Sequence, residues 1–172
     1  EYGNLFREPH FAHLRIGNIY SKLEMHENAL QEYMKAIQLD SQYLTAFYNL
    51  GVAYHKLSRF DESIESFQTC LAINDLSLEV NLQLGHQYFL TGKFSEAIKA
   101  YKRELELDPE NTETRVYLMM AELSICSWDG LPNHIIWIKK MLGKGLLNAP
   151  PWQLLSVVDE PEFELNIAKS YA

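Results

Sequence analysis

The histidines, cysteines and acidic residues of this chain could carry chemistry, but their spacing argues against an active site. No histidine belongs to a His-Glu-x-x-His motif or to the paired Cys/His spacing of zinc sites. The six histidines are His10, His13, His26, His55, His86 and His134. An acidic run is expected to form a solvated face and a helix end, and its members are Glu104, Glu106, Asp108 and Glu110. We therefore expect no metal and no cofactor.

Nucleotide and thiol chemistry are not predicted either. Gly143-Lys144-Gly145 lacks the upstream glycine and the downstream Ser or Thr of a phosphate-binding loop, so it is interpreted as a helix stop. No Gly-x-Ser-x-Gly motif is present. Cys70 and Cys126 each lie in an apolar helical pattern and are predicted to be buried, reduced thiols. These patterns predict that this chain is not itself an enzyme.

Composition narrows the classes of partner. The 172 residues carry a net charge of -8, and the 15 Lys and Arg residues do not cluster, which argues against nucleic acid. No apolar run approaches the roughly 20 residues that span a bilayer, so no membrane partner is expected. The first residues have neither the basic nor the apolar region of a signal peptide, so we expect a cytoplasmic, intracellular location. Because the chain lacks an initiator Met, we expect it to be a fragment or a processed form.

An internal repeat explains most of the sequence. Gly17, Gly51 and Gly85 recur at a spacing of 34 residues. Four further columns keep this register, namely Tyr20, Tyr54 and Tyr88; Ala29, Ser63 and Ala97; Tyr33, Phe67 and Tyr101; and Leu39, Ile73 and Leu107. Each glycine is expected to let the second helix of a hairpin approach the first, opposite the small residue of the Ala29 column.

These columns resemble the tetratricopeptide-repeat family. The resemblance implies an all-α fold, a right-handed superhelical α-solenoid of helix hairpins with C-terminal capping helices. Helix pairs are expected at about 10–40, 44–74 and 78–108, with Ser95 and Asn111 as helix N-caps. The expected segments are a remnant of a preceding repeat at 1–9, repeats at 10–43, 44–77 and 78–111, a partial fourth repeat at 112–126, and a helical cap or linker at 127–172.

The family implies a concave groove, lined by the first helices, that binds a peptide or protein segment. Mapped onto this sequence, the lining is Phe11, Leu14, Asn18, Ser21 and Lys22; Thr45, Tyr48, Val52, His55 and Lys56; and Glu79, Leu82, His86, Phe89 and Leu90. Our candidate partner-binding residues are Phe11, Leu14, Asn18, Tyr48, Asn49, Val52, His55, Leu82, His86, Phe89 and Leu90.

Three occupants of this groove remain open. Asn18 and Asn49 match the asparagines with which some tetratricopeptide domains hold the C-terminal carboxylate of heat-shock chaperones. Leu14, Glu79 and Gln83, however, stand where that site has cations, so a carboxylate would lack charged partners. An apolar or aromatic segment along Tyr48, Val52, Leu82, Phe89 and Leu90 is the second alternative. The chain's own C-terminal helix is the third.

The tail resembles the segment that joins the repeat array to the catalytic region in O-linked N-acetylglucosamine transferase and SPINDLY-like protein glycosyltransferases. The matching residues are Cys126, Trp128, Pro150, Leu154, Leu155, Asp159, Pro161, Leu165, Ala168, Tyr171 and Ala172. The resemblance implies that the chain is the substrate-recruiting region of a nucleotide-sugar-dependent protein O-glycosyltransferase whose catalytic residues lie beyond Ala172. The alternative is a stand-alone adaptor or co-chaperone-like module in which the tail only caps the array.

Overall fold

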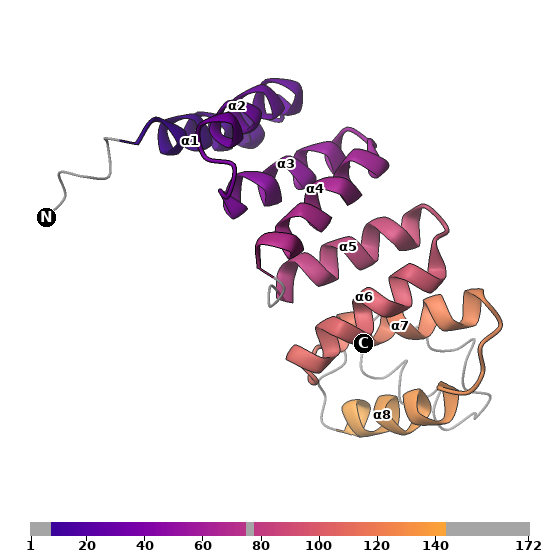
Figure 1. Cartoon of the computed structure of the whole chain (residues 1–172). Coiled ribbons are helices and arrows are strands. Elements are labelled where there is room, and N and C mark those ends of the chain that lie inside the picture. The colour runs from indigo at the N-terminus through magenta and orange to yellow at the C-terminus, as the bar shows by residue number, and fades with distance from the viewer. Residues whose placement is uncertain (1–7, 75–77, 144–172) are drawn as a thin grey trace, which may run out of the picture. The chain divides into compact units, whose positions relative to one another are not determined.

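The computed structural model describes residues 8–74 and 78–143, and the regular secondary structure of these residues is all α-helix (Figure 1). The helices are α1 (Pro9–Lys22), α2 (His26–Leu39), α3 (Leu44–Lys56), α4 (Phe60–Ile73), α5 (Leu78–Leu90), α6 (Phe94–Leu107), α7 (Thr112–Ser124) and α8 (Leu131–Gly143). This confirms the all-α prediction. The helix bounds differ by one residue at most from the helix pairs expected from the sequence.

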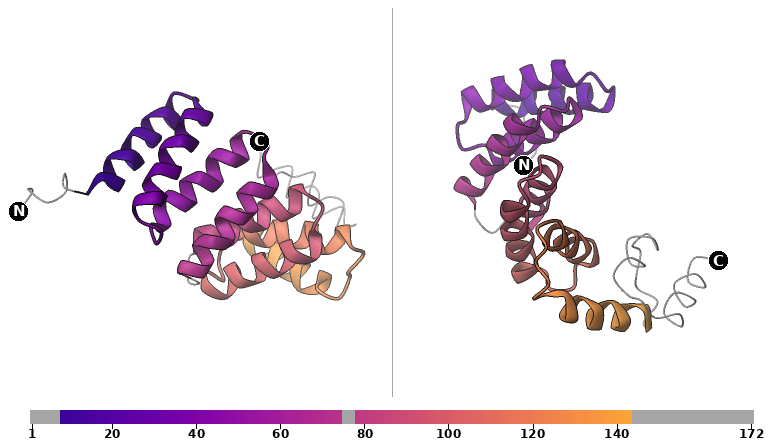
Figure 2. Two further views of the ribbon diagram at one scale, coloured as in Figure 1. Left: turned by 45° about the horizontal axis from the view of Figure 1, so that its top comes forward. Right: turned by 90° about the vertical axis from the view of Figure 1, so that its right-hand side faces the viewer.

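The chain divides into two compact units, residues 1–93 and residues 94–172. Unit 1 holds α1 to α5, and unit 2 holds α6 to α8. Within unit 1 successive helices lie side by side (Figure 2). In the parts of the chain that the structure describes, no helix is both long enough and apolar enough to cross a membrane.

The turns that follow α1, α3 and α5 repeat with the 34-residue period. Glu24, Ser58 and Gly92 all have a positive φ, at 59°, 59° and 72°. In each turn the N–H of the next residue donates to the carbonyl of the tyrosine that recurs in every repeat; the bonds are Met25 to Tyr20 at 2.9 Å, Arg59 to Tyr54 at 2.9 Å and Lys93 to Tyr88 at 2.8 Å. This 6→1 bond is the Schellman closure of a helix C-terminus. The turn geometry therefore repeats although glycine supplies it only at Gly92.

The repeated glycines allow close helix packing, as predicted, and the nearest contact is an aromatic ring. A Cβ atom built on Gly17 would lie 2.5 Å from the ring of Tyr33, and one on Gly51 would lie 2.8 Å from the ring of Phe67. Ser63 also faces Gly51, because its hydroxyl donates to the Gly51 carbonyl at 2.8 Å. Each glycine thus makes room for the aromatic residue of the second helix.

Apolar residues from successive helices form the core of unit 1. One cluster joins α1, α2 and α3 through Leu14, Ala29, Leu30, Tyr33, Ala36, Ala46, Leu50 and Ala53. A second joins α4 to α5 through Ile64, Phe67, Cys70, Val80 and Leu84. The second helix of each hairpin therefore packs on the first helix of the next.

In unit 2, α7 begins at a capped end, and a buried hydrogen bond joins α8 to α7. Asn111 is the N-cap of α7, as predicted, since its Oδ1 accepts a hydrogen bond from Thr114 N at 3.1 Å. His134 on α8 meets Glu122 on α7 at 2.9 Å, and Lys102 meets the same carboxylate at 3.1 Å. α8 lies within the segment 127–172, for which the sequence predicts a helical cap or linker.

Three sequence predictions about single residues are wrong. Ser95 is not an N-cap, because α6 begins one residue earlier, at Phe94. Glu104 does not lie on a solvated face; it is 2% exposed and accepts a hydrogen bond from Asn111 Nδ2 at 2.8 Å. Cys126 is exposed, because α7 ends at Ser124 and the chain turns there with a φ of 55° at Cys126.

Cys70 is buried, as predicted, and burial raises the pKa of its thiol to about 12. α8 is described as far as Gly143, and the helix stop expected at 143–145 extends beyond the described residues. The segment 1–7 and the tail residues from Pro150 to Ala172 lie outside the described residues.

Candidate functional site

A hollow lies between α1 and α3 of unit 1, and it brings together part of the predicted groove. Its volume is about 330 Å³, and its lining residues are Asn18, Ser21, Lys22, Tyr33, Asn49 and Val52. We call it the Asn18–Asn49 hollow. Asn18, Asn49 and Val52 are candidate residues from the sequence, and Ser21 and Lys22 belong to the mapped groove lining. The hollow therefore combines two amide groups, two hydroxyl groups and an ammonium group with the apolar side chain of Val52.

Asn18 is the centre of the hydrogen bonds in this hollow. Its Oδ1 accepts from Tyr33 Oη at 2.9 Å and from Asn49 Nδ2 at 2.8 Å. Since both bonds use the oxygen, the orientation of the amide is fixed and its Nδ2 is committed to neither bond. Burial raises the pKa of Tyr33, so its hydroxyl remains a donor at neutral pH. The network joins α1 to α3, which are the first helices of two successive repeats.

Two further candidate residues bind α3 to α5 through their polar ends. Tyr48 Oη donates to Glu79 Oε1, and His55 Nδ1 lies 3.0 Å from Gln87 Oε1. Burial, together with the neighbouring Glu79 carboxylate, raises the pKa of Tyr48 well above its usual range. The polar groups of Tyr48 and His55 therefore already serve contacts inside unit 1.

The remaining candidate residues are spread over α1 and α5. Leu14 is 8% exposed and belongs to the core cluster, so it offers little surface to a partner. Phe11 packs edge-on against Tyr43 at the start of α3, with ring centroids 5.5 Å apart. On α5, Leu82, His86 and Phe89 are half-buried, while Leu90 is 55% exposed.

Sequence reasoning missed two residues that shape this surface. Tyr33 was assigned only to packing, but its hydroxyl reaches Asn18. Phe67 stands at the equivalent position one repeat later and has no hydroxyl. The presence of Tyr rather than Phe at position 33 could therefore have indicated a hydrogen bond there. Gln87 stands at a position where the earlier repeats have Ile19 and Ala53, and a polar residue in an apolar column indicates a buried hydrogen bond.

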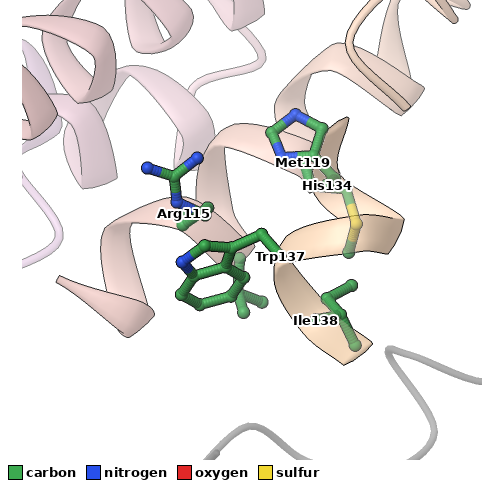
Figure 3. A pocket seen from close by; sticks show the side chains of 6 residues that line it. Arg115, Met119, His134, Trp137 and Ile138 are labelled. Carbon is green, nitrogen blue, oxygen red and sulfur yellow. The ribbon is translucent and has the colours of Figure 1, made fainter. Parts of the chain in front are cut away.

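The described part of unit 2 contains one tight cleft between α7 and α8 (Figure 3). Arg115 lies over the ring of Trp137, with its guanidinium carbon 5.1 Å from the ring centroid, and Met119, His134 and Ile138 line the same cleft. The side chains leave no room for a water molecule there. This cleft is therefore a packing seam between two helices.

Across residues 8–74 and 78–143, no group of three or more His, Cys, Asp or Glu side chains could hold a metal ion. The chemistry that the hollow offers is hydrogen bonding and a single positive charge, which suits recognition of a polar ligand.

Three family models match the sequence. A tetratricopeptide-repeat model matches residues 17–58, a second matches 45–75 and a third matches 79–111. No curated protein matches the chain.

Solved structures share the fold. The first tetratricopeptide domain of Spaghetti (RPAP3), bound to the HSP90 peptide SRMEEVD, is 26% identical with a TM-score of 0.66, covering 69% of this chain and 94% of that one. The first such domain of human RPAP3 is 26% identical with a TM-score of 0.63, covering 69% and 93%. MamA is 22% identical with a TM-score of 0.71, and the match covers 81% of this chain and 80% of MamA. The repeat columns, the hairpin turns and these matches together show that residues 17–75 and 79–111 are tetratricopeptide repeats in a helical solenoid fold.

Proposed function

We propose that this chain binds an extended segment of another protein along the first helices of unit 1, with the Asn18–Asn49 hollow as the main contact. The observation that carries the proposal is the hollow of about 330 Å³, whose lining is mostly polar but includes Val52. A protein surface of this kind can hold a peptide through its backbone and through one or two side chains. We expect a micromolar affinity, because a flexible segment loses conformational freedom when it binds.

The charges along α1, α3 and α5 indicate what kind of segment fits. Lys22 and the two amide groups lie in the hollow and favour a carbonyl or carboxylate oxygen. Glu79 lies on α5 and is exposed, beside Tyr48. Over Glu79 a carboxylate would be repelled, whereas an apolar or basic side chain would be tolerated. The favoured ligand is thus a segment that places an acceptor over the hollow and an uncharged or basic side chain toward α5.

The test is a peptide selection on the full chain followed by titration of the selected peptides. Lys22→Ala and Asn49→Ala should each weaken binding about tenfold, the loss of roughly one charge-assisted hydrogen bond. Lys35→Ala is the matched control, since Lys35 is an exposed lysine on α2 that pairs with Glu32 and lies outside the hollow. Binding that survives both hollow variants and is lost in the control would move the site to another surface. A selection that yields no binding peptide would overturn the proposal.

A co-chaperone-like role is a second candidate. Asn18 and Asn49 meet in the hollow beside Lys22, and a 26%-identical relative was solved with an HSP90 peptide. Buried Leu14 and acidic Glu79 supply no further cation. Titration with SRMEEVD and with its C-terminal amide separates the two candidates. A preference of about tenfold or more for the free carboxylate supports the co-chaperone role, and equal binding or none removes it.

A more specific proposal links the chain to a protein O-glycosyltransferase, and the tail motifs from Cys126 to Ala172 support this link. In that case the chain recruits protein substrates to a catalytic region that follows it. Translation of the DNA downstream of the Ala172 codon tests this. A region resembling a nucleotide-sugar-dependent glycosyltransferase would support the link, and a stop codon would leave the adaptor role.

A further inference from the structure

The outer face of α1 is apolar and exposed. Ala12, Ile16 and Ile19 lie at the helical spacings i, i+4 and i+7, and Leu23 follows directly after the helix ends. Ile16 is 42%, Ile19 58% and Leu23 62% exposed, and Ala12 is exposed as well. We call these four residues the α1 flank. Single exposed apolar residues are ordinary, but four on one stripe indicate a surface that another element covers.

The repeat itself shows what covers this stripe elsewhere in unit 1. The residues one repeat later are Ala46, Leu50, Ala53 and Leu57. Ala46 is 0%, Leu50 7% and Ala53 1% exposed, and Leu57 is half-buried against the same cluster. They pack with Leu30, Tyr33 and Ala36 of α2, the second helix of the preceding hairpin.

The same arrangement recurs one repeat further on. Val80 and Leu84 of α5 stand at the positions of Ala46 and Leu50, and they are 1% and 6% exposed. They pack with Ile64, Phe67 and Cys70 of α4. On both helices the stripe is therefore covered by a helix with an apolar residue, an aromatic residue and a small residue at positions i, i+3 and i+6.

From this equivalence we propose that the α1 flank binds the second helix of a further repeat hairpin, an amphipathic helix with the spacing of Leu30, Tyr33 and Ala36. Ile19 is larger than Ala53 at the equivalent position, so a helix with the residues of α2 must pack slightly farther from α1 than α2 packs from α3. This surface lies on a different side of α1 from Asn18 and Lys22, and the proposal does not depend on the groove.

A grafted repeat tests the surface in the full chain. A second copy of residues 10–43 replaces residues 1–9, which keeps the 34-residue register up to His10. Because stacked repeats stabilise one another, the graft should raise the Tm by about 5 °C or more. Ile19→Glu should abolish that rise, whereas Met34→Glu, a matched change at an exposed apolar residue of α2, should retain it.

Two outcomes overturn the proposal. One is a graft that does not raise the Tm, or that raises the Tm equally in the chain with Ile19→Glu. The other is a dimer of the unmodified chain, detected by light scattering at rising concentration, that Ile19→Glu dissociates. That result would assign the α1 flank to a second copy of this chain. A chain that stays monomeric and is stabilised by the graft only with the intact flank supports the proposal.

Discussion

The side-chain amide of Asn49 donates a hydrogen bond to Asn18 Oδ1 across 2.8 Å, and this contact joins the first helices of two successive repeats. The bond lies in the wall of the hollow, so its strength bears on both stability and binding. We expect Asn49→Ala to lower the free energy of unfolding by about 1 kcal/mol, the usual net contribution of one such bond. Chemical denaturation of the single and double alanine variants at positions 18 and 49 measures the coupling directly. Purely additive losses would show that the two amides do not stabilise each other.

The close packing at Gly51 gives a second prediction. A methyl group there would lie 2.8 Å from the ring of Phe67, which is fully buried and cannot move without cost. Gly51→Ala is therefore expected to lower the free energy of unfolding by about 1–3 kcal/mol, and Gly51→Leu by more. Thermal unfolding followed by circular dichroism measures this loss. In a Phe67→Leu background the same Gly51→Ala change should cost less, and an equal cost would place the clash elsewhere.

The hairpin turns give a third prediction. Ser58 has a φ of 59°, a left-handed conformation that side chains disfavour and glycine adopts freely. Ser58→Gly should raise the free energy of unfolding by up to about 1 kcal/mol. Gly92→Ala is the reciprocal variant, because a Cβ on Gly92 would meet no atom within 4 Å and only the backbone conformation opposes it. It should cost about 1 kcal/mol, and denaturant midpoints with unchanged slopes measure both changes. A loss for Ser58→Gly would contradict the strain at that turn.

Acid sensitivity is the fourth prediction, and it concerns Glu122. Burial raises the pKa of this carboxyl, but hydrogen bonds from His134 and Lys102 outweigh it and hold the pKa below the ordinary 4.5. A carboxyl whose pKa is lower in the folded state stabilises the fold at higher pH. That contribution is complete above the ordinary pKa and is lost as the pH falls through the lowered value. Calorimetric unfolding of Glu122→Gln should therefore show a loss of stability at pH 7 that shrinks on acidification.

Glu104 provides the control for that experiment. Burial raises the pKa of its carboxyl, so the ionised Glu104 lowers the stability of the fold at neutral pH, whereas the ionised Glu122 raises it. Glu104→Gln should stabilise the protein at pH 7, and this gain should disappear once the wild-type carboxyl is protonated at low pH. If both variants changed stability in the same direction, charge burial would not be the cause.

The sequence predicted the helices well because their apolar columns recur with a fixed period. The column of Gly17, Gly51 and Gly85 alone fixes the register of three hairpins. The repeat pattern could not predict the contacts of polar residues that stand at positions where the three repeats differ. Glu104 stands where the earlier repeats have Ala36 and Cys70, so its burial followed from the register, yet its charge suggested a solvated face.

The bonding of the candidate groove residues could not be predicted, for a similar reason. Position along a first helix indicates which residues face the groove, and it brought Asn18, Asn49 and Val52 to one hollow. It does not indicate which of these side chains already bond within the unit. Tyr48 is a candidate partner contact, and its position did not reveal that its hydroxyl donates to Glu79, a residue 31 positions away.

The stacking of Arg115 on Trp137 has a spectroscopic consequence. The three tryptophans of the chain are Trp128, Trp137 and Trp152, and all belong to unit 2. Indole fluorescence therefore reports on unit 2 alone, while unit 1 absorbs and emits only through its tyrosines and phenylalanines. Trp128 is 58% exposed, whereas Trp137 lies half-buried beneath a guanidinium group, so their emission maxima and quenching should differ. One unmodified sample can thus show whether the two units unfold together or in separate steps.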